Sequence, residues 1–297
     1  MISRRGIWRL LGALLPCVVA SSCNYYRVIG DDDGLTDVDG GDDDVTVPVV
    51  PDSTLNVTVL EYCPAPGQFV NVLPEYADGD TEADMCAKAT ELIERGALVT
   101  LGGWGGYIVM RVDPPITTGR FRVLGNAFAG PAPNGSGAAE PGVVSVSYDS
   151  NGNGVADDEW FQIHGSATET DYSMTYFYAD ETWTASDGST GSVQHNAYHL
   201  QPYFPQWLSA AEALTFHGTL LESNGYYDDT LGQYVLQAFD YGYADSWSNT
   251  DERSALVADV DLPQIDFIRV QTGVNQSFPT IGETSTEVCG VQVLSAR

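Results

Sequence analysis

The stretch from Val143 to His164, VVSVSYDSNGNGVADDEWFQIH, shows most clearly how this chain folds. Apolar and polar residues alternate over 143–148, and a second apolar run covers 159–164, as in strands that bury one face. The segment between these runs is rich in Asn and Gly, which favour turns. The stretch therefore predicts two β-strands joined by a polar loop.

The loop has the spacing of a calcium site. Calcium takes about six to eight oxygen ligands, and oxygens on alternate residues of a tight loop can converge on one ion. Counted from Asp149, side-chain oxygens stand at loop positions 1, 3, 5 and 9 and Gly154 stands at position 6, as in the first half of an EF-hand loop. Trp160 replaces the final glutamate of that loop, so Asp158 or Glu159 must supply the remaining oxygens. The predicted Ca²⁺ ligands are Asp149, Asn151, Asn153, Val155 through its carbonyl, Asp157, Asp158 and Glu159.

The alternative for this loop is an Asn/Gly hairpin whose carboxylates are merely solvated. Clustered carboxylates repel one another when no cation lies between them, which favours the calcium site. The sequence therefore predicts calcium as the cofactor of this protein.

On both sides of this stretch, short apolar or alternating runs repeat between clusters of Gly, Pro, Asn and Asp. This pattern is typical of antiparallel all-β domains. We therefore predict an all-β fold, a jelly-roll-like antiparallel β-sandwich. The other predicted strands are Leu55–Leu60, Leu98–Leu101, Tyr107–Val112, Phe121–Gly125, Met174–Tyr178, Leu214–Leu220, Ile265–Thr272 and Thr286–Leu294.

One segment, Thr81–Arg95, has helical spacing instead. Its apolar residues recur at the intervals of one helix face. Thr81 and Asp84 form a capping-box pair, and Gly96 stands where a helix would end. A single short helix over residues 81–95 is therefore predicted.

Residues 1–23 are predicted to be a lipoprotein signal segment. Basic residues precede an apolar run, Leu10–Ala20, that is too short to span a membrane. Small residues then lead to Cys23, which a bacterial lipoprotein signal would make the lipidated first residue of the mature chain. The alternative is a secretory signal cleaved near Ser22. The prediction places the protein at the cell surface, attached to the outer membrane by a lipid anchor alone.

Two further segments follow the signal. Residues 24–55 are predicted to be an acidic, disordered tether, because repeated Asp residues repel one another and little apolar surface is available to bury. Residues 56–297 are predicted to be a β-sandwich binding domain. The three cysteines of the mature chain are Cys63, Cys86 and Cys289, and a Cys63–Cys86 disulfide is predicted, with buried free thiols as the alternative.

The charge of the chain excludes several partners. It has 41 Asp+Glu against 12 Lys+Arg, a formal net charge of −29. Nucleic acid is excluded as a direct partner and an anionic membrane surface is disfavoured, because both require clustered Lys or Arg. A small-molecule or glycan ligand is expected instead, either neutral or cationic or bound in a locally uncharged pocket.

A second oxygen-rich cluster is a candidate metal site. Asp240 and Asp245 stand in one short segment, and Asn126 and Glu140 could converge on it. Glu283 and Glu287 follow much later in the chain. The alternative is that these are ordinary loop acids.

Aromatic residues are the candidate ligand contacts, because exposed Trp and Tyr rings stack on sugars or flat cofactors. The segments around Tyr203 and Trp207 and around Tyr243 and Trp247 are rich in them. The alternative for each ring is core packing. No catalytic motif is present: His195 and His199 lack a nearby Glu for zinc hydrolysis, and no G-x-S-x-G elbow occurs.

Several motifs in order resemble a family of cell-surface lipoproteins of gut Bacteroidota, often labelled PKD-domain or cell-surface proteins. These motifs are Tyr62–Asn71, Leu101–Val109, Leu124–Phe128, Glu140–Val144, Asp149–Trp160, Asp240–Asp245, Ile265–Val270 and Thr272–Gln276. The resemblance implies a surface-exposed, non-catalytic β protein encoded near outer-membrane uptake systems, and some relatives are linked to cobalamin capture. The acidic tether, the low Lys content and the lack of a PKD repeat depart from the pattern.

We therefore expect a calcium-stabilised surface lipoprotein that binds an extracellular nutrient, a corrinoid or a glycan, together with an outer-membrane transporter. Two alternatives remain at this point: a glycan-degrading enzyme with paired carboxylates, and an adhesion or structural module.

Overall fold

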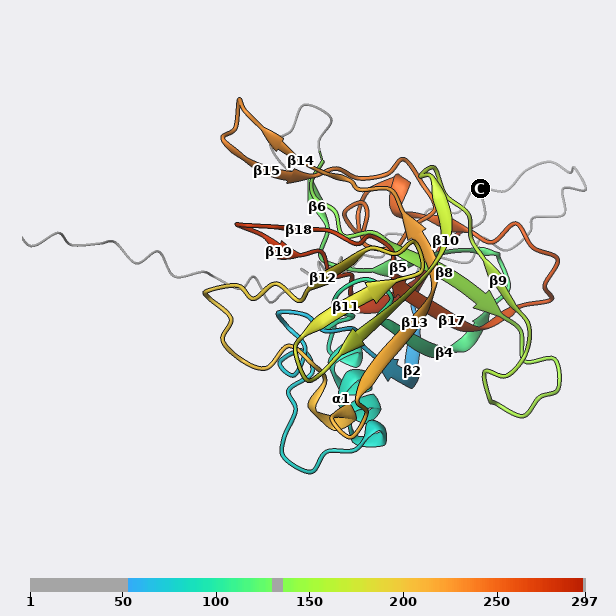
Figure 1. Ribbon diagram of the computed structural model, residues 1–297. Coiled ribbons are helices and arrows are strands. Elements are labelled where there is room, and N and C mark those ends of the chain that lie inside the picture. The colour runs from blue at the N-terminus through green and yellow to red at the C-terminus, as the bar shows by residue number, and fades with distance from the viewer. Residues whose placement is uncertain (1–52, 130–135, 296–297) are drawn as a thin grey trace, which may run out of the picture.

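Antiparallel strands form most of the regular structure in the computed structural model, which describes residues 53–129 and 136–295 (Figure 1). The predicted signal segment with Cys23, and nearly all of the predicted tether, lie outside the described residues. The predicted fold class is confirmed: the chain is an all-β sandwich of antiparallel sheets with one α-helix among the described residues.

The largest sheet has the strand order β2-β4-β17-β8-β9, with every pair antiparallel. In β2, Val57 and Val59 point into the core, and a β-bulge after Val59 shifts the register so that Tyr62 is buried as well. The strands are β2 (Asn56–Cys63), β4 (Tyr107–Ile116), β17 (Ile265–Thr272), β8 (Gly142–Ser147) and β9 (Trp160–Gln162).

A second sheet and the helix enclose the main core with the first. Phe121, Val123 and Val291 of this sheet belong to one apolar cluster with Ile108 and Met110 of β4. Burial of this contiguous apolar surface is the main force holding the two sheets together. The second sheet has the order β1 (Ser53–Thr54), β21 (Gly290–Val293), β5 (Arg120–Leu124) and β16 (Leu256–Val257).

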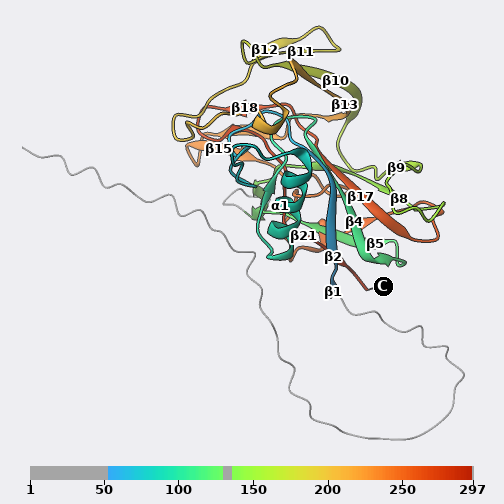
Figure 2. The ribbon, with the colours of Figure 1, turned by 90° about the horizontal axis from the view of Figure 1, so that it is seen from below.

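The helix α1 (Glu82–Glu94) forms where the sequence predicts it. Thr81 is its N-cap, and a capping box with Asp84 satisfies two backbone N–H groups. The helix buries Met85, Ala89 and Ile93 in the main core, lying beside β2 in Figure 2.

A third sheet lies at the other end of the molecule from β1 and β21, as Figure 2 shows. Trp104 packs edge-on against Tyr172 of this sheet, and the hydroxyl of Tyr176 donates to the Trp104 carbonyl over 2.9 Å. These rings form a second apolar cluster beside the main core. The strand order is β12 (Thr190–Ser192), β11 (Thr182–Ala185), β10 (Glu169–Phe177) and β13 (Ala213–Leu221).

Short strand pairs and two 3-10 turns complete the described structure. The pairs are β14 (Gly225–Asp228) with β15 (Gln233–Leu236), β18 (Ser277–Phe278) with β19 (Gly282–Glu283), β20 (Glu287–Val288) with β3 (Val99–Thr100), and β6 (Phe128–Ala129) with β7 (Ser136–Ala138). The turns are η1 (Gln206–Leu208) and η2 (Glu252–Ser254). Each of the ten predicted strand regions contains a strand, and Thr286–Leu294 divides into β20 and β21.

No helix of the described residues is both long and apolar enough to cross a bilayer.

Candidate metal centre

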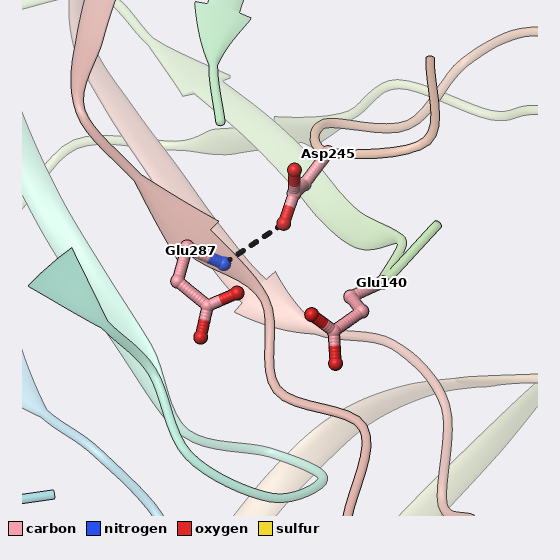
Figure 3. A group of neighbouring side chains, drawn as sticks. All are labelled: Glu140, Asp245 and Glu287. Atoms are coloured by element: carbon pink, nitrogen blue, oxygen red, sulfur yellow. Dashed lines mark hydrogen bonds between the residues drawn. The ribbon is translucent and has the colours of Figure 1, made fainter. Parts of the chain in front are cut away.

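Three carboxylates from distant parts of the chain meet in the interior. Glu140 precedes β8, Asp245 lies in the loop after β15, and Glu287 begins β20. Each offers a carboxylate oxygen, and these oxygens lie within 4.8 Å of one another. Figure 3 shows how the three side chains lie together. We call these three residues the carboxylate centre.

Backbone pairing brings the three segments together. The Glu140 N–H donates to the Asp245 carbonyl over 2.9 Å, and Gly142 and Ala244 exchange two hydrogen bonds of 3.0 Å. Asp245 has a φ of 49°, a left-handed conformation that Asp tolerates better than most residues. A Cβ at Gly125 would lie 2.3 Å from the Asp245 Oδ1, so a glycine is needed for this close approach.

Backbone N–H groups orient two of the carboxylates. Asp245 Oδ1 accepts from the N–H groups of Asn126 and Ala127 over 2.8 and 2.7 Å, and its Oδ2 accepts from the Glu287 N–H over 3.0 Å. Glu140 Oε1 accepts from the Ser285 N–H over 3.0 Å.

Of the three acids in the carboxylate centre, Glu287 has a buried oxygen that lacks a hydrogen-bond partner in the part of the chain that the structure describes. Its side chain is only 3% exposed, and Oε1 accepts from the Thr100 hydroxyl over 3.2 Å. Its Oε2 is buried with no hydrogen-bond partner among the described residues. In Figure 3 this carboxylate faces that of Glu140. A buried, unpaired carboxylate oxygen is costly, so this position calls for a cation or a proton.

The pKa values of the three acids also indicate that a cation or a proton is needed at this centre. Burial, and then the charge of Asp245, raises the pKa of Glu140 to about 8. Burial raises the pKa of Asp245 to about 7 although three backbone N–H groups favour its charged form. Burial raises the pKa of Glu287 well above its usual value, and the charges of Glu140 and Asp245 raise it further. No ion pair of the described residues involves these acids, so no basic side chain neutralises them.

The donor set determines which cation would fit. All three ligands are oxygens, the type that calcium, magnesium and manganese prefer over softer metals. Magnesium usually keeps several waters and uses one or two carboxylates, whereas calcium accepts more protein oxygens in a flexible shell. Asp245 and Glu287 are buried, and Glu140 is partly exposed. The donor set is therefore of the all-oxygen type that calcium, magnesium and manganese take.

The second cluster predicted from sequence is partly brought together. Asp245 and Glu140 meet, and Glu287 completes the group. Asn126 contributes its backbone N–H, not its side chain. Asp240 lies elsewhere: its N–H donates to the Ser166 hydroxyl over 2.9 Å, because it precedes the turn that carries Asp245 inward.

The loop from Asp149 to Glu159 joins β8 to β9 and projects from the body of the protein in Figure 1. The two Asp149 oxygens accept from the N–H groups of Asn153 and Gly154 over 3.0 and 2.8 Å. Asn151 and Asn153 each donate a side-chain N–H to Asp157. The loop therefore gathers these four predicted ligands, and calcium there stays a prediction.

The other three predicted ligands of this loop, Asp158, Val155 and Glu159, differ in burial and in hydrogen bonding. Asp158 Oδ1 accepts from the Ser150 hydroxyl, and its Oδ2 is buried without a partner among the described residues. The Val155 N–H donates to Asn153 Oδ1 over 2.7 Å, and its side chain is exposed. Glu159 is exposed. The loop acids do not form a group of three converging carboxylates of the kind found at the carboxylate centre.

The aromatic residues predicted to contact a ligand pack inside the protein, which corrects that expectation. Tyr203, Tyr243 and Trp247 are buried, and Arg253 covers the Trp247 ring at 3.3 Å. Trp207 is partly buried and stacks on Tyr62 with ring centroids 5.6 Å apart. Two of the four rings use their polar ends internally: the Tyr243 hydroxyl donates to Glu169 and the Trp247 indole donates to the Phe239 carbonyl.

The predicted Cys63–Cys86 disulfide is not formed in the structure, where both residues are free thiols. Cys63 packs against the cluster around Trp104, whereas Cys86 packs against the main core. The two side chains therefore belong to different apolar clusters.

Comparison with protein-family models and with curated proteins finds no match for this chain. The geometry of the sites is thus the basis for assigning a function.

Proposed function

We propose that this protein is a calcium-stabilised, surface-exposed lipoprotein whose β-sandwich binds an extracellular nutrient, a glycan or a corrinoid, for outer-membrane uptake. The observation that carries the calcium part is the carboxylate centre. It gathers three acids in the interior with no basic partner, and the buried Oε2 of Glu287 has no hydrogen bond to a described residue.

A cation at this centre would tie together three segments. Glu140 leads into β8, Asp245 lies in the loop after β15, and Glu287 begins β20. Without a cation, folding must bury these carboxylates protonated or bear their mutual repulsion. Calcium is abundant outside cells, so a surface protein can rely on it as a permanent structural part.

The location at the cell surface rests on the sequence. The basic start, the short apolar run and Cys23 support export and lipid anchoring, and the acidic segment after them supports a solvated spacer. The resemblance to surface lipoproteins near uptake systems supports a partnership with an outer-membrane transporter.

Binding is favoured over glycan hydrolysis at the carboxylate centre. Two acids flanking a scissile glycosidic bond must reach the substrate. Asp245 and Glu287 are only 3% exposed each, so no sugar chain can lie between them. The acids of this centre therefore suit a structural ion and not a substrate.

Thermal unfolding of chelator-treated protein tests this proposal. With calcium at about a hundred times its Kd, the melting temperature should rise by about 5–10 °C. Magnesium at the same concentration should give a smaller rise. Equal melting curves with and without calcium would contradict the calcium part of the proposal.

A further inference from the structure

A pocket separate from the carboxylate centre lies between the third sheet and the β18–β19 hairpin. Its volume is about 340 Å³, within the range of small-molecule sites. Five parts of the chain line it: the loop after β2, the turn before β4, strands β10 and β11, the segment from β12 onward, and the β18–β19 region. Convergence of distant segments on one concave site is typical of ligand pockets.

An aromatic wall forms one side of the pocket. Trp183 is partly buried and lies against Gly191, where a Cβ would come within 2.5 Å of the indole ring. Trp104 and Tyr176 form the floor, fixed to each other by the hydrogen bond between the Tyr176 hydroxyl and the Trp104 carbonyl. Because Trp104 and Tyr176 are almost fully buried, Trp183 is the ring best placed to contact a ligand.

Polar residues also line the pocket. Glu283 lines the pocket, where its Oε1 accepts from the Gln68 N–H and its Oε2 has no hydrogen-bond partner among the described residues. Asn275 and Gln194 also line it, and both are exposed. The side-chain amides of Asn275 and Gln194 can donate hydrogen bonds to ligand hydroxyls and accept hydrogen bonds from them.

This combination defines the class of ligand. An aromatic ring and exposed amides that line the same pocket suit a ligand ring that is apolar on its faces and carries hydroxyls at its edge. The formal net charge of −29 disfavours an anionic ligand. Glu283 is the only acid lining the pocket, so the pair of carboxylates that glycoside hydrolysis requires is absent from it.

We propose that the pocket between Trp183 and Glu283 binds a ring of a neutral glycan without cleaving it. This inference rests on the proposed binding function and names its ligand class and site. The same segment reaches the carboxylate centre: the Ser285 N–H donates to Glu140 and the Glu287 N–H donates to Asp245. A cation there would fix the stretch that carries Glu283, so glycan binding is strongest in the calcium-loaded protein.

Isothermal titration calorimetry with a defined panel tests the site. The probes are cellohexaose, xylohexaose, mannohexaose, laminarihexaose and maltohexaose, with hyaluronate hexasaccharide as an anionic glycan and cyanocobalamin as the corrinoid. At least one neutral hexasaccharide should bind calcium-loaded protein and remain uncleaved on chromatography. Trp183→Ala should weaken that binding about tenfold or more, as expected for a central aromatic contact.

Tyr241→Ala is the matched control, because Tyr241 is 58% exposed and does not line the pocket. It should bind the glycan as the wild type does. Absence of binding to every neutral probe, or equal binding by wild type and Trp183→Ala, would overturn the pocket proposal, as would binding of cyanocobalamin or hyaluronate alone. The calcium-dependent melting shift is measured on the same samples. Glycan binding without that shift would contradict the calcium part of the proposed function and leave the pocket supported.

Discussion

At the scale of single residues, Glu287 shows how one side chain couples stability to a cation. Its backbone N–H holds Asp245 in place, while its own carboxylate lies buried beside Glu140. In the metal-free protein this carboxylate opposes folding when it is charged. With a cation bound, the same charge would become a ligand and favour folding.

Glu287→Gln should therefore have opposite effects in the two states. The metal-free variant should melt higher than the metal-free wild type at pH 8, because folding no longer has to protonate this carboxylate or bury it charged. Calcium should raise its melting temperature much less than that of the wild type. Differential scanning calorimetry with and without calcium measures both effects.

The control for this substitution is Asp229→Asn, an exposed acid in the turn between β14 and β15. It should match the wild type in both conditions. A full calcium response in Glu287→Gln would show that this side chain is not a ligand.

At the scale of structural elements, the helix α1 tests how well local sequence signals determine structure. Both hydrogen bonds of the capping box between Thr81 and Asp84 are formed, over 3.3 and 2.9 Å. Thr81→Ala removes the side-chain acceptor and should lower the free energy of unfolding by about 1 kcal/mol. Urea denaturation followed by circular dichroism measures this, with Thr230→Ala in an exposed turn as a control that should change stability little.

A substitution tests the calcium site predicted in the loop between β8 and β9. Asp149→Asn keeps the size of the side chain but removes the charge at the first ligand position. If the loop binds calcium as its spacing predicts, this variant should bind one Ca²⁺ per chain fewer than the wild type. Native mass spectrometry counts the ions. An unchanged count would mean that the loop is a hairpin held by its Asn and Asp hydrogen bonds alone.

Elements with strong local signals could be predicted from sequence, and those that depend on tertiary pairing could not. The helix with its cap and the long apolar strands β4 and β17 carry clear patterns. Strands β11, β12, β18 and β19 are short and largely polar, and they form because neighbouring strands pair with them.

The candidate sites also divide into one that a local sequence pattern indicates and one that depends on tertiary pairing. The calcium spacing after Asp149 is local, so it is readable from the sequence. The convergence of Glu140, Asp245 and Glu287 depends on strand pairing, and the sequence indicates only that these acids are available. The aromatic assignments to Tyr203 and Trp247 were wrong because a proline-bearing or tyrosine-rich context does not determine which rings the fold buries.

At the scale of the whole molecule, the buried acids predict an unusual pH dependence. The pKa values of Glu140 and Asp245 rise on folding from 4.5 to about 8 and from 3.8 to about 7. The folded metal-free protein therefore binds more protons than the unfolded chain between about pH 4 and 8, and its stability should fall as the pH rises through this window. With calcium bound, this fall should be much smaller, because the cation takes the place of the protons.

Melting temperatures measured from pH 5 to 8.5, with chelator and with calcium, test this prediction. The chelator series should decline and the calcium series should stay nearly level. Parallel curves would contradict the link between the buried acids and a cation. Constant ionic strength is required, because a formal net charge of −29 adds its own salt-dependent repulsion.

The most direct test is the calcium content of a variant that lacks all three charges of the carboxylate centre, Glu140→Gln with Asp245→Asn and Glu287→Gln. Wild type and variant are loaded with calcium, passed through metal-free buffer, and analysed by inductively coupled plasma mass spectrometry, with circular dichroism to establish that both are folded. We predict that the wild type retains one Ca²⁺ per chain more than the variant. Equal calcium content in the two folded proteins would contradict a cation at this centre and leave its acids to be neutralised by protons.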